Sequence, residues 1–152
     1  MERGVLLIMR RALLAFLLWG LCARVLSGSQ AVVLVVGPDS SVVDLDPLTV
    51  RKLFLGLPVL INGHPLHPLR NRSDPRLDPI FLQQIVAMSQ SAYDRQILVG
   101  VNRQGWLRPQ EVTSGRRVLD ALYTDPSAVT FVWLRDVEHD PRIRVIRVLW
   151  AD

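Results

Sequence analysis

The stretch AVVLVV at residues 31–36, followed directly by GPD at residues 37–39, decides the fold of this chain. Six consecutive apolar residues, four of them valine, that end at a Gly-Pro pair are typical of a strand buried on both faces. A strand with no wet face must be covered on both sides, and helices usually provide that cover. The stretch therefore predicts a sheet between layers of helix.

Helix starts can be recognised on the C-terminal side of this strand. The pair Asp46-Pro47 predicts the first, because Asp caps free amides and Pro suits the first helical position, and Gly56 ends that helix as a left-handed cap. Three more helices are indicated by a capping residue ahead of apolar residues at helical spacing. They are Ser73 or Asp74 before Leu77, Phe81, Ile85 and Met88; Ser89 or Ser91 before Tyr93, Ile97 and Leu98; and Ser114 before residues 116–123.

A tight turn at Asn62-Gly63 separates residues 59–61 from residues 65–69. Prolines at positions 65 and 68 predict that the second of these segments is an edge strand or an extended connection. Residues 106–113 predict a loop.

Two further strands are expected near the C-terminus. Residues 129–134 form a second apolar run. Residues 142–150 alternate between apolar and arginine residues, which predicts a strand with one wet face and with Ile143, Val145, Val148 and Trp150 on the other face. Strands separated by helices predict a mixed α/β fold, with a mixed sheet flanked by helices.

Residues 1–29 predict a secretory signal peptide. Arg10-Arg11 precedes an uncharged apolar run at residues 12–23, and small residues follow at positions 27–29. We expect cleavage near Ser29 or Ala31, which leaves residues 30–152 as one periplasmic or secreted domain. The alternative is an uncleaved membrane anchor, extended by residues 5–9.

The only cysteine, Cys22, lies in this leader, so the exported domain has no intramolecular disulfide. Four of the 18 Lys and Arg residues and one of the 14 Asp and Glu residues also lie there, which leaves a net charge of +1. The remaining arginines are scattered rather than clustered beside aromatic residues. The sequence therefore does not favour a nucleic acid as a partner.

Short phrases in a fixed order resemble the phosphate-binding-protein family of ABC-type uptake systems, which has the type 2 periplasmic binding fold. The phrases are Leu53-Phe54-Leu55-Gly56, Asn62-Gly63, Pro68-Leu69-Arg70 ahead of a capped helix with Phe81, and DPSAVTFV at residues 125–132. The resemblance covers about residues 31–150. Family members have two lobes that close on a ligand, and this chain has the length of one, so the resemblance implies a single, non-catalytic lobe that holds half of an anion site.

Arg70, Arg72 and Ser73 are the candidate anion contacts, because a guanidinium beside free amides at a helix start suits phosphate, sulfate or another oxyanion. The alternative is an ordinary helix cap with two solvated arginines. A membrane protein or a second copy of the chain, joined through exposed strand edges, is the other expected kind of partner. Asp74 would repel an anion, which favours the rival hypothesis of a structural protein-interaction domain that has lost its ligand.

The sequence predicts neither a metal nor a cofactor, and no catalytic residue. His64 and His67 stand three apart across a turn, with His139 far along the chain, and no cysteine supports them as ligands. The serine residues lack the setting of a nucleophile and no histidine is placed beside them by a motif, so we expect them to cap helices and the protein not to be an enzyme.

Overall fold

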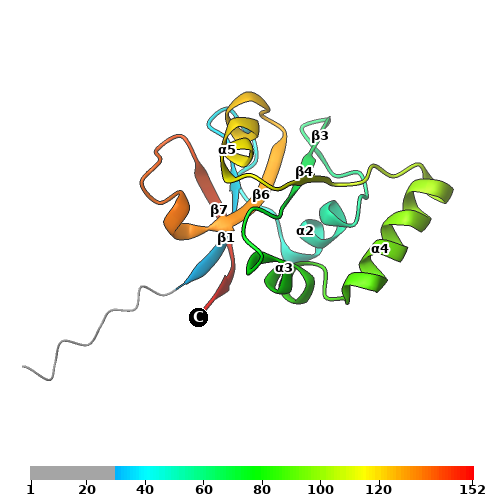
Figure 1. Cartoon of the computed structure of the whole chain (residues 1–152). Helices are drawn as coiled ribbons and strands as arrows, with labels where there is room; N and C mark the ends of the chain where they lie inside the picture. Colours follow the sequence, from blue (N-terminus) through cyan, green and yellow to red (C-terminus); the bar gives the residue numbers. More distant parts are fainter. Residues whose placement is uncertain (1–29) are drawn as a thin grey trace, which may run out of the picture.

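Strand β1 (Ala31–Val36) lies inside a five-stranded sheet in the computed structural model, which describes residues 30–152 (Figure 1). The predictions of a signal peptide, an anchor and an unpaired Cys22 fall outside these residues. The strand order is β5-β4-β6-β1-β7, with β1 antiparallel to both neighbours and β4 parallel to both of its own. The other strands of this sheet are β4 (His67–Asn71), β5 (Gln110–Val112), β6 (Ala128–Trp133) and β7 (Arg144–Ala151).

Helices cover both faces of this sheet, and all six residues of β1 are buried, which confirms the predicted fold class. The helices are α2 (Pro47–Phe54), α3 (Leu77–Ile80) continued by the π-helical turn η2 (Phe81–Ile85), α4 (Gln90–Val99) continued by η3 (Gly100–Gln104), and α5 (Gly115–Thr124), with a short turn η4 (Leu134–Asp136). Within residues 30–152, no helix has both the length and the apolar character needed to cross a bilayer.

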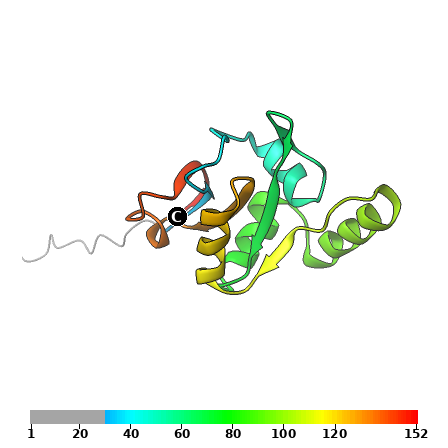
Figure 2. The ribbon, with the colours of Figure 1, turned by 90° about the horizontal axis from the view of Figure 1, so that it is seen from above.

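The two faces carry separate cores. On one face, α2, α3, η2 and α4 pack a cluster of aromatic rings in which Phe81 stacks on Phe131 and meets Tyr93 edge to face. On the other face, α5 buries Val118 and Leu122 against the sheet. Figure 2 shows α5 on the opposite side of the sheet from α2, while α4 extends away from the sheet. The sheet thus stands between two layers of helix, as the sequence predicts.

Most of the local signals act as predicted. Asp46 Oδ1 accepts from the amides of Leu48 and Thr49, each at 3.0 Å, and so caps α2. Ser89 caps α4 through the amide of Ala92. Gly56 has a φ of 86° and ends α2. The Asn62-Gly63 turn joins β2 (Leu60–Ile61) to β3 (His64–Pro65).

Two predictions about strands are wrong. Residues 67–71 form an interior strand rather than an edge, because Pro68 pairs only with β6 and the ladder to β5 begins one residue later, at Leu69. At Pro68, β4 therefore has a paired strand on one side only, so the amide that proline lacks is not required for a hydrogen bond to β5. The segment predicted as a loop, residues 106–113, contains β5.

The inward face of β7 agrees with the prediction only in part, since Ile143 is buried just before the strand and Trp150 packs against the core. Val145 and Val148 are 44% and 59% exposed, while Ile146 and Leu149 pack against the core. The pairing of β7 with β1 shifts register twice, between Val32 and Val33 and between Leu34 and Val35. Each shift breaks the two-residue period on which the prediction relied.

Candidate functional site

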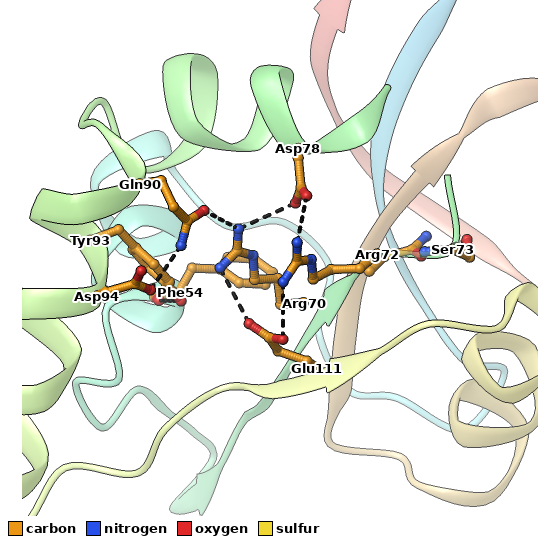
Figure 3. A network of polar contacts seen from close by, with 10 residues as sticks. Phe54, Arg70, Arg72, Ser73, Asp78, Gln90, Tyr93, Asp94 and Glu111 are labelled. Atoms are coloured by element: carbon orange, nitrogen blue, oxygen red, sulfur yellow. Dashed lines mark hydrogen bonds and ion pairs between the residues drawn. The ribbon is translucent and has the colours of Figure 1, made fainter. Parts of the chain in front are cut away.

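The predicted anion contacts lie at the carboxyl ends of β4 and β5, which meet at one edge of the sheet because the two strands are parallel. Arg70 of β4 is opposite Glu111 of β5 in the register. Beyond β4 the chain turns through residues 72–76 into α3. The structure brings the side chains of Arg70 and Arg72 together, whereas Ser73 points away from both guanidinium groups (Figure 3).

Arg70 is almost fully buried, with 1% of its side chain exposed. Its guanidinium lies over the rings of Phe81 and Tyr93, with distances of 4.6 and 4.9 Å from Cζ to the ring centroids. Arg70 Nη2 donates to Gln90 Oε1 at 2.8 Å and to Asp78 Oδ1 at 3.2 Å, and Nη1 donates to Glu111 Oε1 at 3.3 Å. A buried cation is stable only with such partners.

Arg72 shares the two carboxylates with Arg70. Its Nη2 donates to Asp78 Oδ2 at 3.1 Å and its Nη1 donates to Glu111 Oε2 at 3.3 Å. Each carboxylate therefore bridges both guanidinium groups, and the four side chains form a closed ring with no net charge (Figure 3). We call these four residues the Arg-carboxylate ring. The negative charge of Asp78 is the main reason that the pKa of Arg72 is raised above its usual value.

Tyr93 lies beside this ring, and its hydroxyl donates to the carbonyl of Phe54 at 3.0 Å. Burial raises the pKa of Tyr93 to about 12, since the phenolate would lose its hydration. The side chain thus stays neutral beneath the guanidinium of Arg70.

Ser73 is also occupied by the chain itself. Its amide and its hydroxyl both donate to Asn71 Oδ1, at 3.0 and 2.7 Å. It does not cap α3, contrary to the prediction, because that helix begins only at Leu77 and has no side-chain cap at its N-terminus. The only hydroxyl proton of Ser73 is therefore already used.

Asp74 fills the turn before α3. Its Oδ1 accepts from the amide of Arg76 at 2.9 Å, and its Oδ2 accepts from Arg76 Nη2 at 2.6 Å and from Trp133 Nε1 at 3.0 Å. These hydrogen bonds, chiefly those from the Arg76 side chain, hold the pKa of Asp74 well below its usual range. The turn before α3, where the sequence predicts an anion bound from solution, thus holds the carboxylate of Asp74.

A shallow hollow of about 650 Å³ opens beside the Arg-carboxylate ring. Arg72, with 40% of its side chain exposed, lines it together with Asp78, Ser89 and Gln90. An oxyanion that entered the hollow would meet Arg72, but also the carboxylate of Asp78. To contact both guanidinium groups it would have to displace carboxylate oxygens.

The sequence did not point to the partners of the arginines, which are Asp78, Gln90 and Glu111. Glu111 was missed because its segment was predicted as a loop. Assigned as a strand, that segment would have placed Glu111 on the face opposite Val112, which is the buried apolar residue of β5. A charged residue in a strand that also packs on the core indicates that a partner of opposite charge lies close to it.

The candidate metal ligands do not gather at this edge. His67 Nδ1 lies 2.7 Å from Asp125 Oδ2, and His139 lies 3.4 Å from Glu138. In the part of the chain that the structure describes, no three His, Cys, Asp or Glu residues are grouped so that they could hold a metal ion.

Neither family models nor curated proteins match this chain. One similar solved structure is that of a protein from Clostridium perfringens, described as a phosphate ABC transporter substrate-binding protein with bound phosphate. The match covers 78% of this chain and 45% of the Clostridium perfringens chain, with a TM-score of 0.58 and 12% sequence identity. An ABC-type phosphate transport receptor from Vibrio cholerae matches 78% and 46%, with a TM-score of 0.49 and 15% identity.

A third solved structure, the substrate-binding domain of a molybdenum ABC transporter from Clostridium difficile, matches 79% of this chain and 43% of its own, with a TM-score of 0.44 and 15% identity. This chain spans less than half the length of each of these solved proteins. At 12% identity, the first match shows a shared fold only: the mixed sheet with helices on both faces is that of a part of a periplasmic binding protein.

Proposed function

We propose that this protein is an exported, non-catalytic domain that docks on another protein and whose anion site is closed by its own carboxylates. Residues 1–29 would direct export, and residues 30–152 would form one lobe of the periplasmic-binding-protein type. The start of β1 at Ala31, directly after the predicted leader, supports this boundary. The Arg-carboxylate ring is the observation that carries the proposal.

The ring argues against an external anion on energetic grounds. Arg70 is desolvated, and its two terminal nitrogens have three side-chain partners that offset much of its cost of burial, while its buried Nε has no partner within residues 30–152. Replacing Asp78 or Glu111 by phosphate would leave a carboxylate beside a second negative charge. The two negative charges would lie within hydrogen-bonding reach of the same guanidinium, and like charges so close together repel strongly near a protein surface.

Exposed apolar side chains support a docking role. Leu98, Val99 and Val101 are exposed on α4 and η3, the segment that extends away from the sheet (Figure 2). On the opposite edge of the sheet, Val145 and Val148 are exposed on β7. Leu98 and Val101 stand three positions apart on one continuous helix and so share a face, and neighbouring exposed apolar side chains are typical of interaction surfaces. The partner would be a membrane protein of an uptake system or a second copy of the chain.

Calorimetric titration of the purified protein with phosphate and with sulfate tests the closed site. We expect no saturable heat from the wild type at millimolar ligand. The double variant Asp78→Asn with Glu111→Gln keeps the shape of the ring but frees both guanidinium groups, and we expect it to gain saturable binding. The double variant Asp136→Asn with Glu138→Gln removes two exposed carboxylates and the same charge, so it is the matched control and should gain nothing.

A second candidate function is weak oxyanion binding by Arg70, Arg72 and Ser73, as the sequence analysis proposed. The exposure of Arg72 at the hollow of about 650 Å³ favours it. Saturable phosphate binding by the wild type, lost in Arg72→Gln, would establish this function and overturn the closed site.

A further inference from the structure

An apolar cavity of about 510 Å³ lies at the amino ends of β4 and β5, the opposite end of these strands from the Arg-carboxylate ring. Its wall comes from the end of α2, the segment from Pro65 to Leu69, and residues 104–110. Nine of its fifteen lining residues are leucine, proline or tryptophan. The size and the apolar wall are those of sites for small molecules.

Close packing holds the wall in shape. A Cβ on Gly100 would lie 2.1 Å from Trp106 Cε3, so the indole ring lies directly on the backbone of η3. A Cβ on Gly56 would lie 2.6 Å from the carbonyl oxygen of Leu107. The amide of Trp106 donates to the carbonyl of Gly100 at 3.2 Å. The loop that carries Trp106 and Leu107 is therefore fixed against two helix ends, and the cavity is formed before any ligand enters.

Among the lining residues Arg108 carries the permanent charge, while His67 lies 2.7 Å from the carboxylate of Asp125 and Arg108 also borders a small pocket that Asp94 and Glu111 line. Arg108 is exposed and takes part in none of the ion pairs formed within residues 30–152. The side-chain amides of Gln104 and Gln110 supply further donors. The lining residues, all in the described part of the chain, include no carboxylate. An anionic group would be attracted to Arg108, and an apolar group would pack against the leucine, proline and tryptophan side chains of the cavity.

We propose that this cavity binds a small amphipathic monocarboxylate, with its apolar part against Trp106 and the leucines and its carboxylate on Arg108. This site is separate from the predicted anion contacts and uses none of them. A guanidinium binds a carboxylate with two parallel hydrogen bonds, which gives the site its preference for a charged head. The apolar wall selects against short, fully hydrated anions.

Calorimetric titration with octanoate tests this assignment, with octanol and acetate as probes that lack the charge and the chain. We expect saturable octanoate binding, octanol binding about tenfold weaker because a charge-assisted hydrogen bond is lost, and no acetate binding. Equal affinity for octanoate and octanol would overturn the proposal, as would the absence of saturation below the concentration at which octanoate self-associates.

Two pairs of surface variants locate the site without disturbing the core. Arg108→Gln should weaken octanoate binding about tenfold and leave octanol binding unchanged, whereas Arg103→Gln, outside the cavity, should change neither. Leu107 is 78% exposed, so Leu107→Glu should fold and should repel octanoate from the wall. Leu98→Glu, at a residue that is 53% exposed and outside the cavity, is its control. Octanoate binding that survives Leu107→Glu, or that Leu98→Glu weakens equally, contradicts the proposed site.

Discussion

The two ends of strands β4 and β5 differ in how their side chains find partners. At the carboxyl ends, Arg70 and Arg72 have two carboxylates and a glutamine amide from the same chain. At the amino ends, Arg108 forms no ion pair within residues 30–152, although it also borders a small pocket that Asp94 and Glu111 line. Two guanidinium groups at one end of a strand pair can therefore be neutralised from within the chain, while an apolar cavity bordered by an arginine lies at the other end of the same strands.

The difference has a consequence for how each end responds to mutation. A ring of buried and bridged charges contributes to stability, so its loss should be measured in the unfolding of the protein. The exposed residues of the cavity wall contribute little to stability, so their loss should be measured in binding, whereas a change in the close contact between Gly100 and Trp106, which holds the wall, should be measured in unfolding.

The largest effect is expected at Arg70. Arg70→Ala removes a buried guanidinium that lies over two aromatic rings and leaves both carboxylates without it, and it should lower the free energy of unfolding by about 3 kcal/mol. Arg72→Ala removes a partly exposed partner of the same carboxylates and should cost less than about 1 kcal/mol. Urea denaturation followed by circular dichroism measures both. Equal losses would mean that the ring is a surface feature rather than part of the core.

A smaller effect is expected at the opposite end. Gly100→Ala places a methyl group within the Trp106 ring and should cost about 2 kcal/mol, the range for overpacking. The displaced indole should shift its fluorescence emission to longer wavelength. Gly115→Ala is the control: the nearest atom to its Cβ is Ser73 Oγ at 4.0 Å, and it lies at the first position of α5, so stability should be unchanged or slightly higher. An unchanged stability of Gly100→Ala would show that the wall is loose.

Much of the fold follows from local sequence signals. The buried strand at residues 31–36, the cap at Asp46 and the turn at Asn62 are all determined by residues close together in the chain, and the structure has each of them. The facing of β7 could not be predicted, because two register shifts depend on its pairing with β1. Pro68 led to the wrong prediction of an edge strand for a similar reason. Whether the missing amide of Pro68 breaks a hydrogen bond depends on where the pairing with β5 begins, and that pairing begins at Leu69.

The candidate site was predicted less well than the fold. Arg70 and Arg72 stood out as charged residues beside a helix start, and the structure does bring them together. Their partners come from segments that lie 8 and 41 positions from Arg70 in the chain, so no local pattern connects them. A sequence shows which residues carry charge, but the charge that faces each of them is set by tertiary packing.

The smallest effect concerns Asp74, whose carboxylate joins Arg76 to Trp133 in the turn before α3. Asp74→Asn keeps one oxygen for the amide of Arg76, but it replaces the oxygen that accepts from the Trp133 indole by an NH2 group and removes the charge, so it should cost about 1 kcal/mol at pH 7. Because the pKa of Asp74 is lowered on folding, its charge contributes stability above the unfolded pKa of 3.8, and that contribution is lost as the pH falls below this value. Urea denaturation at pH 7 and at successively lower pH should show the wild type approaching the variant. A difference that stays constant down to pH 2 would mean that the shape of Asp74, rather than its charge, holds the turn before α3.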